Sequence, residues 1–490
     1  MVHRIALVHL WISALFAGVA AAHETRVSDP GEARWLAGDH HIHSRYSVGW
    51  DRASDPPSPI VGGDAIYPIP MNAVMARRFG LDWMVTTDHG GPQHSKVNLE
   101  HAYPELLESR AAVPEVLQFF GMEFDTPGAD HSSLIMPHSH EEADDLHRIE
   151  SRFNKREPWP EDPEWDTEPR MLQALSEMKA LARPPLVIAH HPSRSAPGLG
   201  EYGMTEPSEL RAWNDLAPDI AVGMEGAPGH QATAQMDRGL SPTLYEQYFG
   251  DQRPRGGYRD YPTMGGYDQM TARLGGFWDS MLGEGRRWWI TANSDSHIHW
   301  SEGGADFWPG EYSKTYVLAE KSYQAIFDAI RAGRIFVTTG DLVSELWVQA
   351  STGDRRVGIG EALKVAPGTN VSVSIRFLDP DTQNHHGDSP EVERVDLIVG
   401  QVSGGAAAAD SDHNPSAEVL ARFTVDDWQR DGAYKFINYR LDDVRHALYL
   451  RVRGTNTDEL EPEPDEDNED AWQDLWFYSN PIFIELLEGE

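Results

Sequence analysis

Cysteine is absent from this chain of 490 residues. Its absence excludes disulfide bonds, cysteine-ligated zinc, iron–sulfur clusters and a lipid-modified N-terminal cysteine, so every metal ligand must be nitrogen or oxygen. Lysine is scarce beside arginine, and the formal net charge is −37. Such a surface repels nucleic acid and anionic lipid. We therefore expect no nucleic-acid partner, and we interpret the acidity as an adaptation for solubility in a salty extracytoplasmic setting.

Long apolar runs are lacking beyond the N-terminus. Residues 1–22 pass from Arg4 through an apolar stretch to three alanines, which are small residues of the kind that signal peptidase accepts. We predict a signal peptide over 1–22, a mature chain that begins at His23, and a periplasmic or secreted location. An uncleaved membrane anchor is the alternative. We expect no stable membrane insertion after cleavage, because no other segment could span a bilayer.

The length favours two or three domains. Strand-like and helix-like runs alternate over 35–342, which is typical of an α/β barrel or a doubly wound sheet. Beyond residue 344 the pattern changes to short alternating strands, which predict an antiparallel β-sandwich. We therefore expect a barrel domain over 23–344 and a sandwich domain over 345–490. Within the second domain, the acidic, proline-containing run 458–470 is predicted to be a solvated loop.

Histidine and aspartate gather in four short clusters, and each follows an apolar run that has the character of a strand. In chain order they are Asp39 to His43, Asp88 with His89, His190 to Pro192, and Ser294 to His297. Side chains at i and i+2 of a strand project the same way, so His41 with His43, and Asp295 with His297, can each bind one metal. Ligands at the carboxyl ends of successive strands are typical of the active-site face of an α/β barrel.

These clusters resemble, in order and spacing, the four motifs of the PHP (polymerase and histidinol phosphatase) superfamily, and the whole chain is similar to its secreted branch related to the carbaryl hydrolases. The resemblance covers roughly 35–342. It implies an α/β fold, with a distorted (β/α)7 barrel followed by a C-terminal antiparallel β-sandwich. It also implies two or three divalent metal ions, of Mn, Zn or Fe.

The resemblance further implies a set of ligands. The first metal takes His41, His43 and Asp295, Glu123 bridges to a second metal held by His131 and His191, and a third metal takes His89 and His297. Related proteins often place an Asp or His shortly after the first motif, but this chain has Val48 to Asp51 there. Asp51 or Asp64 could substitute, and a dinuclear site is the alternative.

A water shared by two divalent cations loses a proton near neutral pH and becomes a positioned nucleophile. We therefore expect a secreted hydrolase that uses a metal-bridging hydroxide to cleave a small-molecule phosphoester. Arg194 is the predicted cation that stabilises the developing charge, and a surface salt bridge is the alternative role for it. Asp88 and Asp39 are predicted to orient the ligating histidines, and Asp88 also to relay a proton. Hydrolysis of a carboxyl ester or carbamate, an amidohydrolase-type barrel, and a non-catalytic binding protein are alternatives.

Other histidines receive simpler interpretations. His40 and His190 should point away from the metals if their neighbours point in, and we interpret them either as structural or as residues that support the ligands. Five further histidines are predicted to lie in exposed loops: His94, His138, His140, His230 and His299. The stretch 230–267, rich in glycine, proline and tyrosine, is predicted to be an insertion, either a lid that determines specificity or a packed surface segment.

Overall fold

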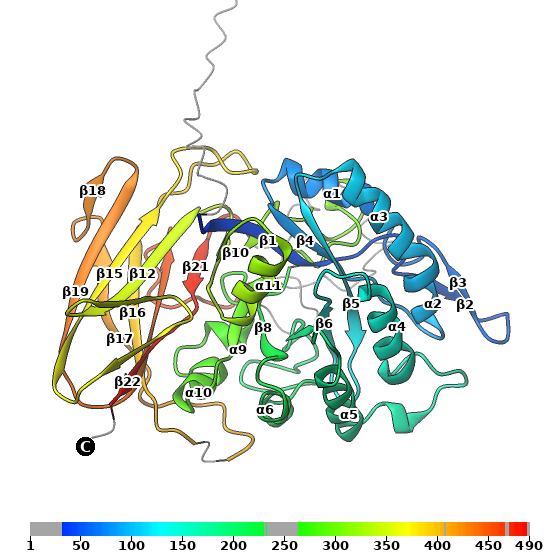
Figure 1. The fold of residues 1–490 in the computed structure, drawn as a ribbon. Coiled ribbons are helices and arrows are strands. Elements are labelled where there is room, and N and C mark those ends of the chain that lie inside the picture. Colours follow the sequence, from blue (N-terminus) through cyan, green and yellow to red (C-terminus); the bar gives the residue numbers. More distant parts are fainter. Residues whose placement is uncertain (1–31, 230–231, 233–262, 406–407, 466–469, 488–490) are drawn as a thin grey trace, which may run out of the picture.

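The computed structural model describes residues 32–229, 232, 263–405, 408–465 and 470–487. The predicted signal peptide, and the predicted insertion from 230 to 262 apart from residue 232, lie outside the described residues. The described chain is a mixed α/β protein with one large mixed sheet and a separate antiparallel sheet. Figure 1 shows the α/β part in blue to green, beside the strand-rich C-terminal part in yellow to red.

Strands and helices alternate through the N-terminal part, as predicted (Figure 1). The strands are β1 (Arg34–Ile42), β2 (Gly49–Asp51), β3 (Ser58–Ile60), β4 (Trp83–Thr86), β5 (Leu117–Asp125), β6 (His131–Ile135), β7 (Leu186–Ala189), β8 (Ala221–Ala227), β9 (Trp289–Ala292), β10 (Ser313–Ala319) and β11 (Ile335–Thr339). The α-helices are α1 (Ile69–Arg78), α2 (His94–Val97), α3 (Tyr103–Ala112), α4 (Glu142–Phe153), α5 (Glu168–Lys179), α6 (Pro207–Leu216), α9 (Gln269–Ala272), α10 (Phe277–Gly283) and α11 (Tyr323–Arg331). Short π or 3-10 segments are η1 (Asn98–Ala102), η2 (Pro163–Trp165) and η3 (Trp300–Glu302).

The large sheet brings the predicted ligand segments together. Strands β1, β4 and β5 pair in parallel, β6 is antiparallel to β5 and β7, and β7, β8 and β9 again pair in parallel. A parallel bridge between Ile42 and Ser296 joins the end of β1 to the loop after β9. All of β1 after Arg34 is buried, as expected for a strand that is covered on both faces. The carboxyl ends of β1, β4, β7 and β9 therefore surround one region.

The C-terminal part has the short strands that the sequence predicts. They are β12 (Glu345–Thr352), β13 (Arg355–Gly358), β14 (Ala362–Val365), β15 (Thr369–Leu378), β16 (Arg394–Gln401), β17 (Glu418–Thr424), β18 (Gln429–Asp431), β19 (Tyr434–Val444), β20 (Leu448–Thr455), β21 (Trp476–Ser479) and β22 (Ile482–Leu486). Strands β13, β12, β15, β19 and β18 form the five-stranded antiparallel sheet. The others extend the large sheet, because β21 pairs with both β20 and β11. The large sheet is therefore continuous across residue 344.

The prediction of a solvated acidic loop is wrong around Asp465, which is only 6% exposed. Its carboxylate accepts hydrogen bonds from the amides of Gly265 and Gly266, at 2.6 and 3.1 Å. Both glycines have positive φ, 56° and 76°, a conformation that costs glycine little and turns successive amides toward one anion. The loop therefore contacts the chain just after the predicted insertion.

Local sequence accounts for the ends of several elements. Helix α1 begins at Ile69, and Pro70 is favourable in its first turn. Among the described residues, no helix has the length and apolar character that a membrane crossing requires.

Candidate metal centre

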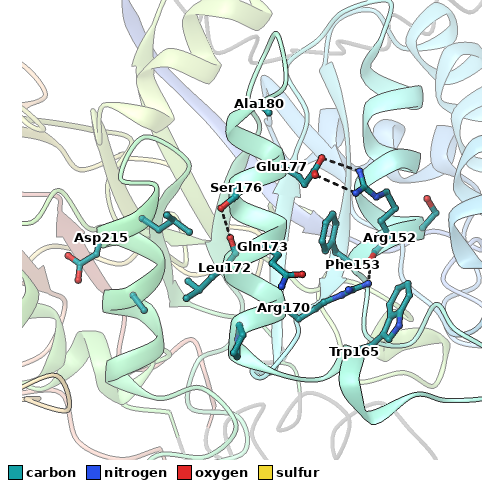
Figure 2. Close-up of a pocket in the computed structure, with 14 residues that line it drawn as sticks. Arg152, Phe153, Trp165, Arg170, Leu172, Gln173, Ser176, Glu177, Ala180 and Asp215 are labelled. Atoms are coloured by element: carbon teal, nitrogen blue, oxygen red, sulfur yellow. Dashed lines mark hydrogen bonds and ion pairs between the residues drawn. The ribbon is translucent and has the colours of Figure 1, made fainter.

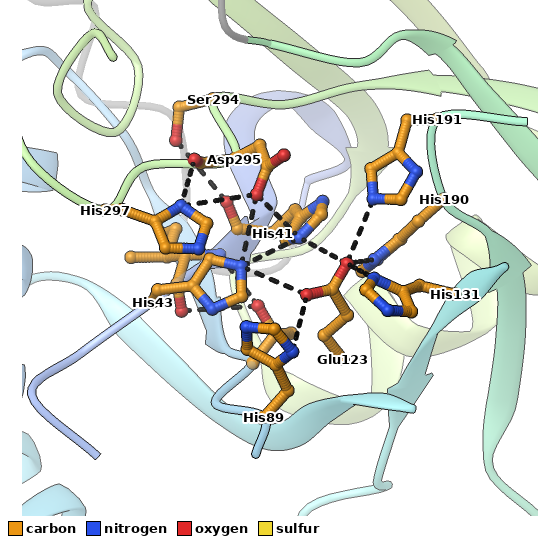
Figure 3. A network of polar contacts seen from close by, with 12 residues as sticks. His41, His43, His89, Glu123, His131, His190, His191, Ser294, Asp295 and His297 are labelled. Atoms are coloured by element: carbon orange, nitrogen blue, oxygen red, sulfur yellow. Dashed lines mark hydrogen bonds and ion pairs between the residues drawn. The ribbon is translucent and has the colours of Figure 1, made fainter. Parts of the chain in front are cut away.

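The predicted ligands converge at the carboxyl ends of the strands. Glu123 lies in β5 and His131 begins β6. His191 and Asp295 follow the ends of β7 and β9, and His89 follows β4. Figure 3 shows their side chains, together with those of His41, His43 and His297, directed toward a common centre around Glu123. The structure thus brings all eight predicted ligands together.

The first cluster consists of His41, His43 and Asp295, as the resemblance implies. The Nε2 atoms of His41 and His43 lie 3.0 Å apart, and Asp295 Oδ1 lies 2.9 and 3.1 Å from them. Their side chains are at most 1% exposed. Two imidazole nitrogens and a carboxylate oxygen facing one another in a dry interior are the donor set of a Zn, Mn or Fe site.

Glu123 stands at the middle of the cluster. Its Oε1 atom lies within 3.3 Å of four imidazole nitrogens, from His41, His131, His190 and His191. Its Oε2 atom lies 3.5 Å from ring nitrogens of both His43 and His89. One oxygen cannot accept well-directed hydrogen bonds from four crowded rings, whereas a carboxylate can bridge two metals. The geometry therefore fits the bridging position.

A third group joins His43, His89 and His297. The rings of His43 and His297 are stacked, with centroids 3.7 Å apart. Asp64 Oδ2 lies 2.9 Å from His89 Nε2 and 3.5 Å from His297 Nε2, whereas the carboxylate of exposed Asp51 accepts from the amide of Ala53. Of the two substitutes considered for the third position, only Asp64 is placed to act there.

Burial and neighbouring charges shift the pKa values of two adjacent histidines, His41 and His43, in opposite directions. Burial would lower the pKa of His41, but the carboxylates of Asp295, Glu225 and Glu123 raise it well above its usual value. Burial and the nearby His297 lower the pKa of His43 well below its usual value. The pKa values of these two neighbouring rings are therefore shifted in opposite directions by burial and by the charges around each ring.

Two of the ligands occupy strained backbone. His191 has φ of 23° and Asp295 has φ of 48°, values that are uncommon for residues other than glycine. Gly229 approaches the second of these loops so closely that an added Cβ would lie 2.3 Å from the carbonyl oxygen of Ser294. Strain of this kind persists where the surrounding structure holds it, and it concentrates at functional sites.

The prediction that His190 points away from the cluster is wrong. Its Nδ1 atom lies 3.1 Å from Glu123 Oε1, and its ring stacks on His41 with centroids 3.5 Å apart. The alternation rule fails because β7 ends at Ala189, and the positive φ of His191 then reverses the chain. His40, in contrast, contacts hydroxyl groups of the core through both ring nitrogens, at 2.9 and 2.7 Å.

Asp39 and Asp88 contact the first motif through its backbone and serines. Asp39 Oδ1 accepts from the amide of His41 at 2.9 Å. Asp88 accepts from the amide and hydroxyl of Ser44 and from Ser47 Oγ, at 2.6, 2.7 and 3.0 Å. Ser47 Oγ in turn lies 2.7 Å from His43 Nδ1. Asp88 therefore supports His43 through Ser47 rather than contacting His89.

Arg194 lies beside the second cluster, which we define as Glu123 with the three histidines on its Oε1 atom, His131, His190 and His191. Its guanidinium group forms a bidentate pair with Asp130, at 2.7 and 3.2 Å, and Nη2 lies 3.4 Å from His131 Nδ1. The Asp130 side chain is 5% exposed and that of Arg194 is 36% exposed. Burial alone would lower the pKa of Arg194, but Asp130 and Glu123 raise it, so the group keeps its charge. Asp130 thus fixes a cation at the edge of the cluster.

Three residues were missed or misplaced by sequence reasoning. Glu225 is fully buried and contacts His41 and His191. The sequence feature that could have pointed to it is a single carboxylate within the otherwise uncharged strand β8. His94, predicted to be exposed, is fully buried against Glu150, and His299 is only 5% exposed. His138 and His140 are exposed as predicted, and His230 lies outside the described residues.

A surface pocket lies in another part of the α/β region. Figure 2 shows a surface pocket lined by α4, α5 and α6 together with Trp165, in which Arg152 pairs with Glu177. None of its lining residues is one of the predicted ligands. This pocket is therefore distinct from the His/Glu/Asp cluster.

Comparisons with known proteins do not supply a family. No family model matches the sequence, and no curated protein matches it. The functional argument therefore depends on the residues and their geometry.

Proposed function

We propose that this chain is a secreted, metal-dependent hydrolase of the PHP superfamily that cleaves a phosphoester. The observation that carries the proposal is the convergence of four separate sequence motifs on Glu123 (Figure 3). A single pair of histidines on one strand is weak evidence for a metal site. Eight predicted ligands that meet in one cluster are much stronger evidence. The donor set, all nitrogen and oxygen, suits divalent Zn, Mn or Fe.

The finer architecture is part of the same proposal. The parallel bridge from Ile42 to Ser296 supports a closed (β/α)7-type barrel. Apolar residues of both C-terminal sheets, including Phe377 from one and Leu397 and Val452 from the other, share one core and support a β-sandwich. The proposed location, periplasmic or secreted, depends on the signal peptide predicted over 1–22.

Each residue of the cluster has a proposed role. His41, His43 and Asp295 would hold one ion, and Glu123 would bridge to an ion held by His191 with His131 or His190. The third group, with Asp64, would hold another. Bound divalent ions supply Lewis acidity and lower the pKa of water. Asp39 and Asp88 keep the first motif in place, and Asp130 directs Arg194 toward a substrate anion.

Arg194 favours an anionic substrate over a neutral one. A guanidinium group matches phosphoryl oxygens bidentately, and its carboxylate partner is buried while the arginine is partly exposed. A neutral carbamate or carboxyl ester would use the same nucleophile but gain less from this cation. The phosphoester is therefore the first substrate class to test.

The test is turnover by the purified protein with added Mn²⁺ or Zn²⁺. Aryl phosphate monoesters and diesters are compared with naphthyl esters and carbamates. We expect metal-dependent release of the aryl alcohol from a phosphoester, abolished in the double variant His41→Ala/His43→Ala. If the protein cleaves carbamates and no phosphoester, the proposed substrate class is a carbamate instead. If the metal-loaded protein cleaves none of these compounds, the proposed activity is contradicted.

A further inference from the structure

Glu225 is a fully buried carboxylate behind the metal cluster. It lies in β8, whose seven residues are all buried and otherwise carry no charge. Its Oε1 atom lies 2.7 Å from His41 Nδ1, and its Oε2 atom accepts from the amide of His191 at 2.5 Å. An ionised carboxylate in such a place is costly unless hydrogen bonds satisfy both oxygens. Here the two bonds come from two different ligand segments.

The contact with His41 fixes the ring. A carboxylate accepts, so His41 Nδ1 must carry the proton, and Nε2 then presents its lone pair. That Nε2 atom lies 2.9 Å from Asp295 Oδ1 and 3.3 Å from Glu123 Oε1. Glu225 thereby sets both the tautomer and the direction of a ligand in the first cluster.

The contact with His191 fixes the backbone. The φ of 23° at this residue is unfavourable for a side chain with a Cβ, and the short hydrogen bond from its amide holds the turn in place. This turn directs His191 Nε2 to 3.0 Å from Glu123 Oε1, in the second cluster. The same carboxylate therefore supports one ligand of each cluster.

We propose that Glu225 is a positioning residue that couples the two metal positions sharing Glu123, so that its loss weakens binding at both. The inference rests on the proposed metal centre. Glu225 also belongs to a group with His40 and His190 whose atoms could hold a metal. Its two oxygens accept hydrogen bonds from His41 and His191, and both ring nitrogens of His40 contact hydroxyl groups, which favours the positioning role over ligation.

Metal titration of Glu225→Gln tests the coupling. Glutamine keeps the size but cannot accept from both donors with both terminal atoms. We expect the affinity for Zn²⁺ or Mn²⁺ to fall by about 10- to 100-fold at both positions, which is the usual effect of losing a carboxylate behind a ligating histidine. Wild-type affinity at both positions, or weakening at only one, would overturn the coupling.

Glu150→Gln is the matched control. Glu150 is also 0% exposed and its Oε1 atom also lies 2.7 Å from a buried histidine, His94, outside the metal cluster. Its replacement should lower thermal stability while leaving the metal affinities at their wild-type values. Equal loss of affinity in both variants would show that any buried His–Glu pair matters equally, and would overturn a specific role for Glu225.

A measurement on the wild-type protein decides the question even if the variant does not fold. Nitrogen-15 NMR of histidines in the zinc-loaded protein should show His41 protonated at Nδ1 and ligated through Nε2. Ligation through Nδ1 would overturn the proposed orientation. A wild-type protein that binds no metal would contradict the metal centre itself. Metal binding that is the same in wild type and Glu225→Gln would contradict only the role of Glu225.

Discussion

Replacement of His94 by glutamine should cost stability in a pH-dependent way. His94 is fully buried, with Nδ1 at 2.7 Å from Glu150 Oε1 and Nε2 at 2.8 Å from the carbonyl oxygen of Tyr46. Both partners accept, so the ring that fits carries two protons. Burial lowers the pKa of His94, but Glu150, the carbonyl of Tyr46 and Asp88 together outweigh burial and raise it from 6.5 to about 9.

The size of the effect follows from that shift. A rise from 6.5 to about 9 corresponds to about 3 kcal/mol of folding free energy. Because the folded pKa exceeds the unfolded one, this stability is fully present below pH 6.5 and is lost as pH rises through about 9. The protonated ring fits the site, whereas glutamine has no charge to lose.

Urea unfolding of the metal-loaded wild type and His94→Gln measures the prediction. The difference in unfolding free energy should shrink by about 3 kcal/mol between pH about 6 and about 10. Burial and the adjacent Glu150 also raise the pKa of Glu157, to about 7, and His94 partly opposes that rise. Glu157 therefore adds its own change near pH about 7, and the loss assigned to His94 is the one centred near pH about 9. A difference that stays constant with pH would refute a protonated His94.

Three further predictions concern the cluster. Asp64→Asn should lower the metal content by one ion per chain, measured by mass spectrometry, because Asp64 serves only the third group. His190→Gln should weaken metal binding in calorimetric titration, whereas His40→Gln should not, since only His190 faces Glu123. Arg194→Lys should raise KM for an aryl phosphate more than it lowers kcat, because lysine cannot reproduce the fork held by Asp130. Unchanged metal content, binding or KM would contradict the respective assignment.

Much of the site could be predicted because strand ends are visible in a sequence. Short apolar runs such as Leu186–Ala189 stop at His or Asp, and the carboxyl ends of parallel strands meet at one edge. The alternation rule fails just beyond a strand, which explains the error at His190. The alternation rule also cannot identify Glu225, because the contacts of Glu225 are with residues 184 and 34 positions away in the sequence.

The C-terminal part shows the same division between local and long-range information. Alternating burial of Val371, Val373, Ile375 and Phe377 in β15 is visible as period two in the sequence. The pairing of β21 with β11 cannot be seen in the sequence, because strand partners depend on tertiary packing rather than on local pattern. Asp465 was predicted to be solvated from composition alone, and the two glycine amides that bury it lie 200 and 199 residues earlier.

The most direct test of the account is the number of metal ions in the purified protein. Mass spectrometry of the wild type and of His41→Ala/His43→Ala, after dialysis against the same free Zn²⁺ or Mn²⁺, gives that number. The account predicts two or three ions per wild-type chain and the loss of at least the first-cluster ion in the variant, together with phosphoesterase activity. A wild-type chain that retains no ion, or a variant that retains the full number, would contradict it.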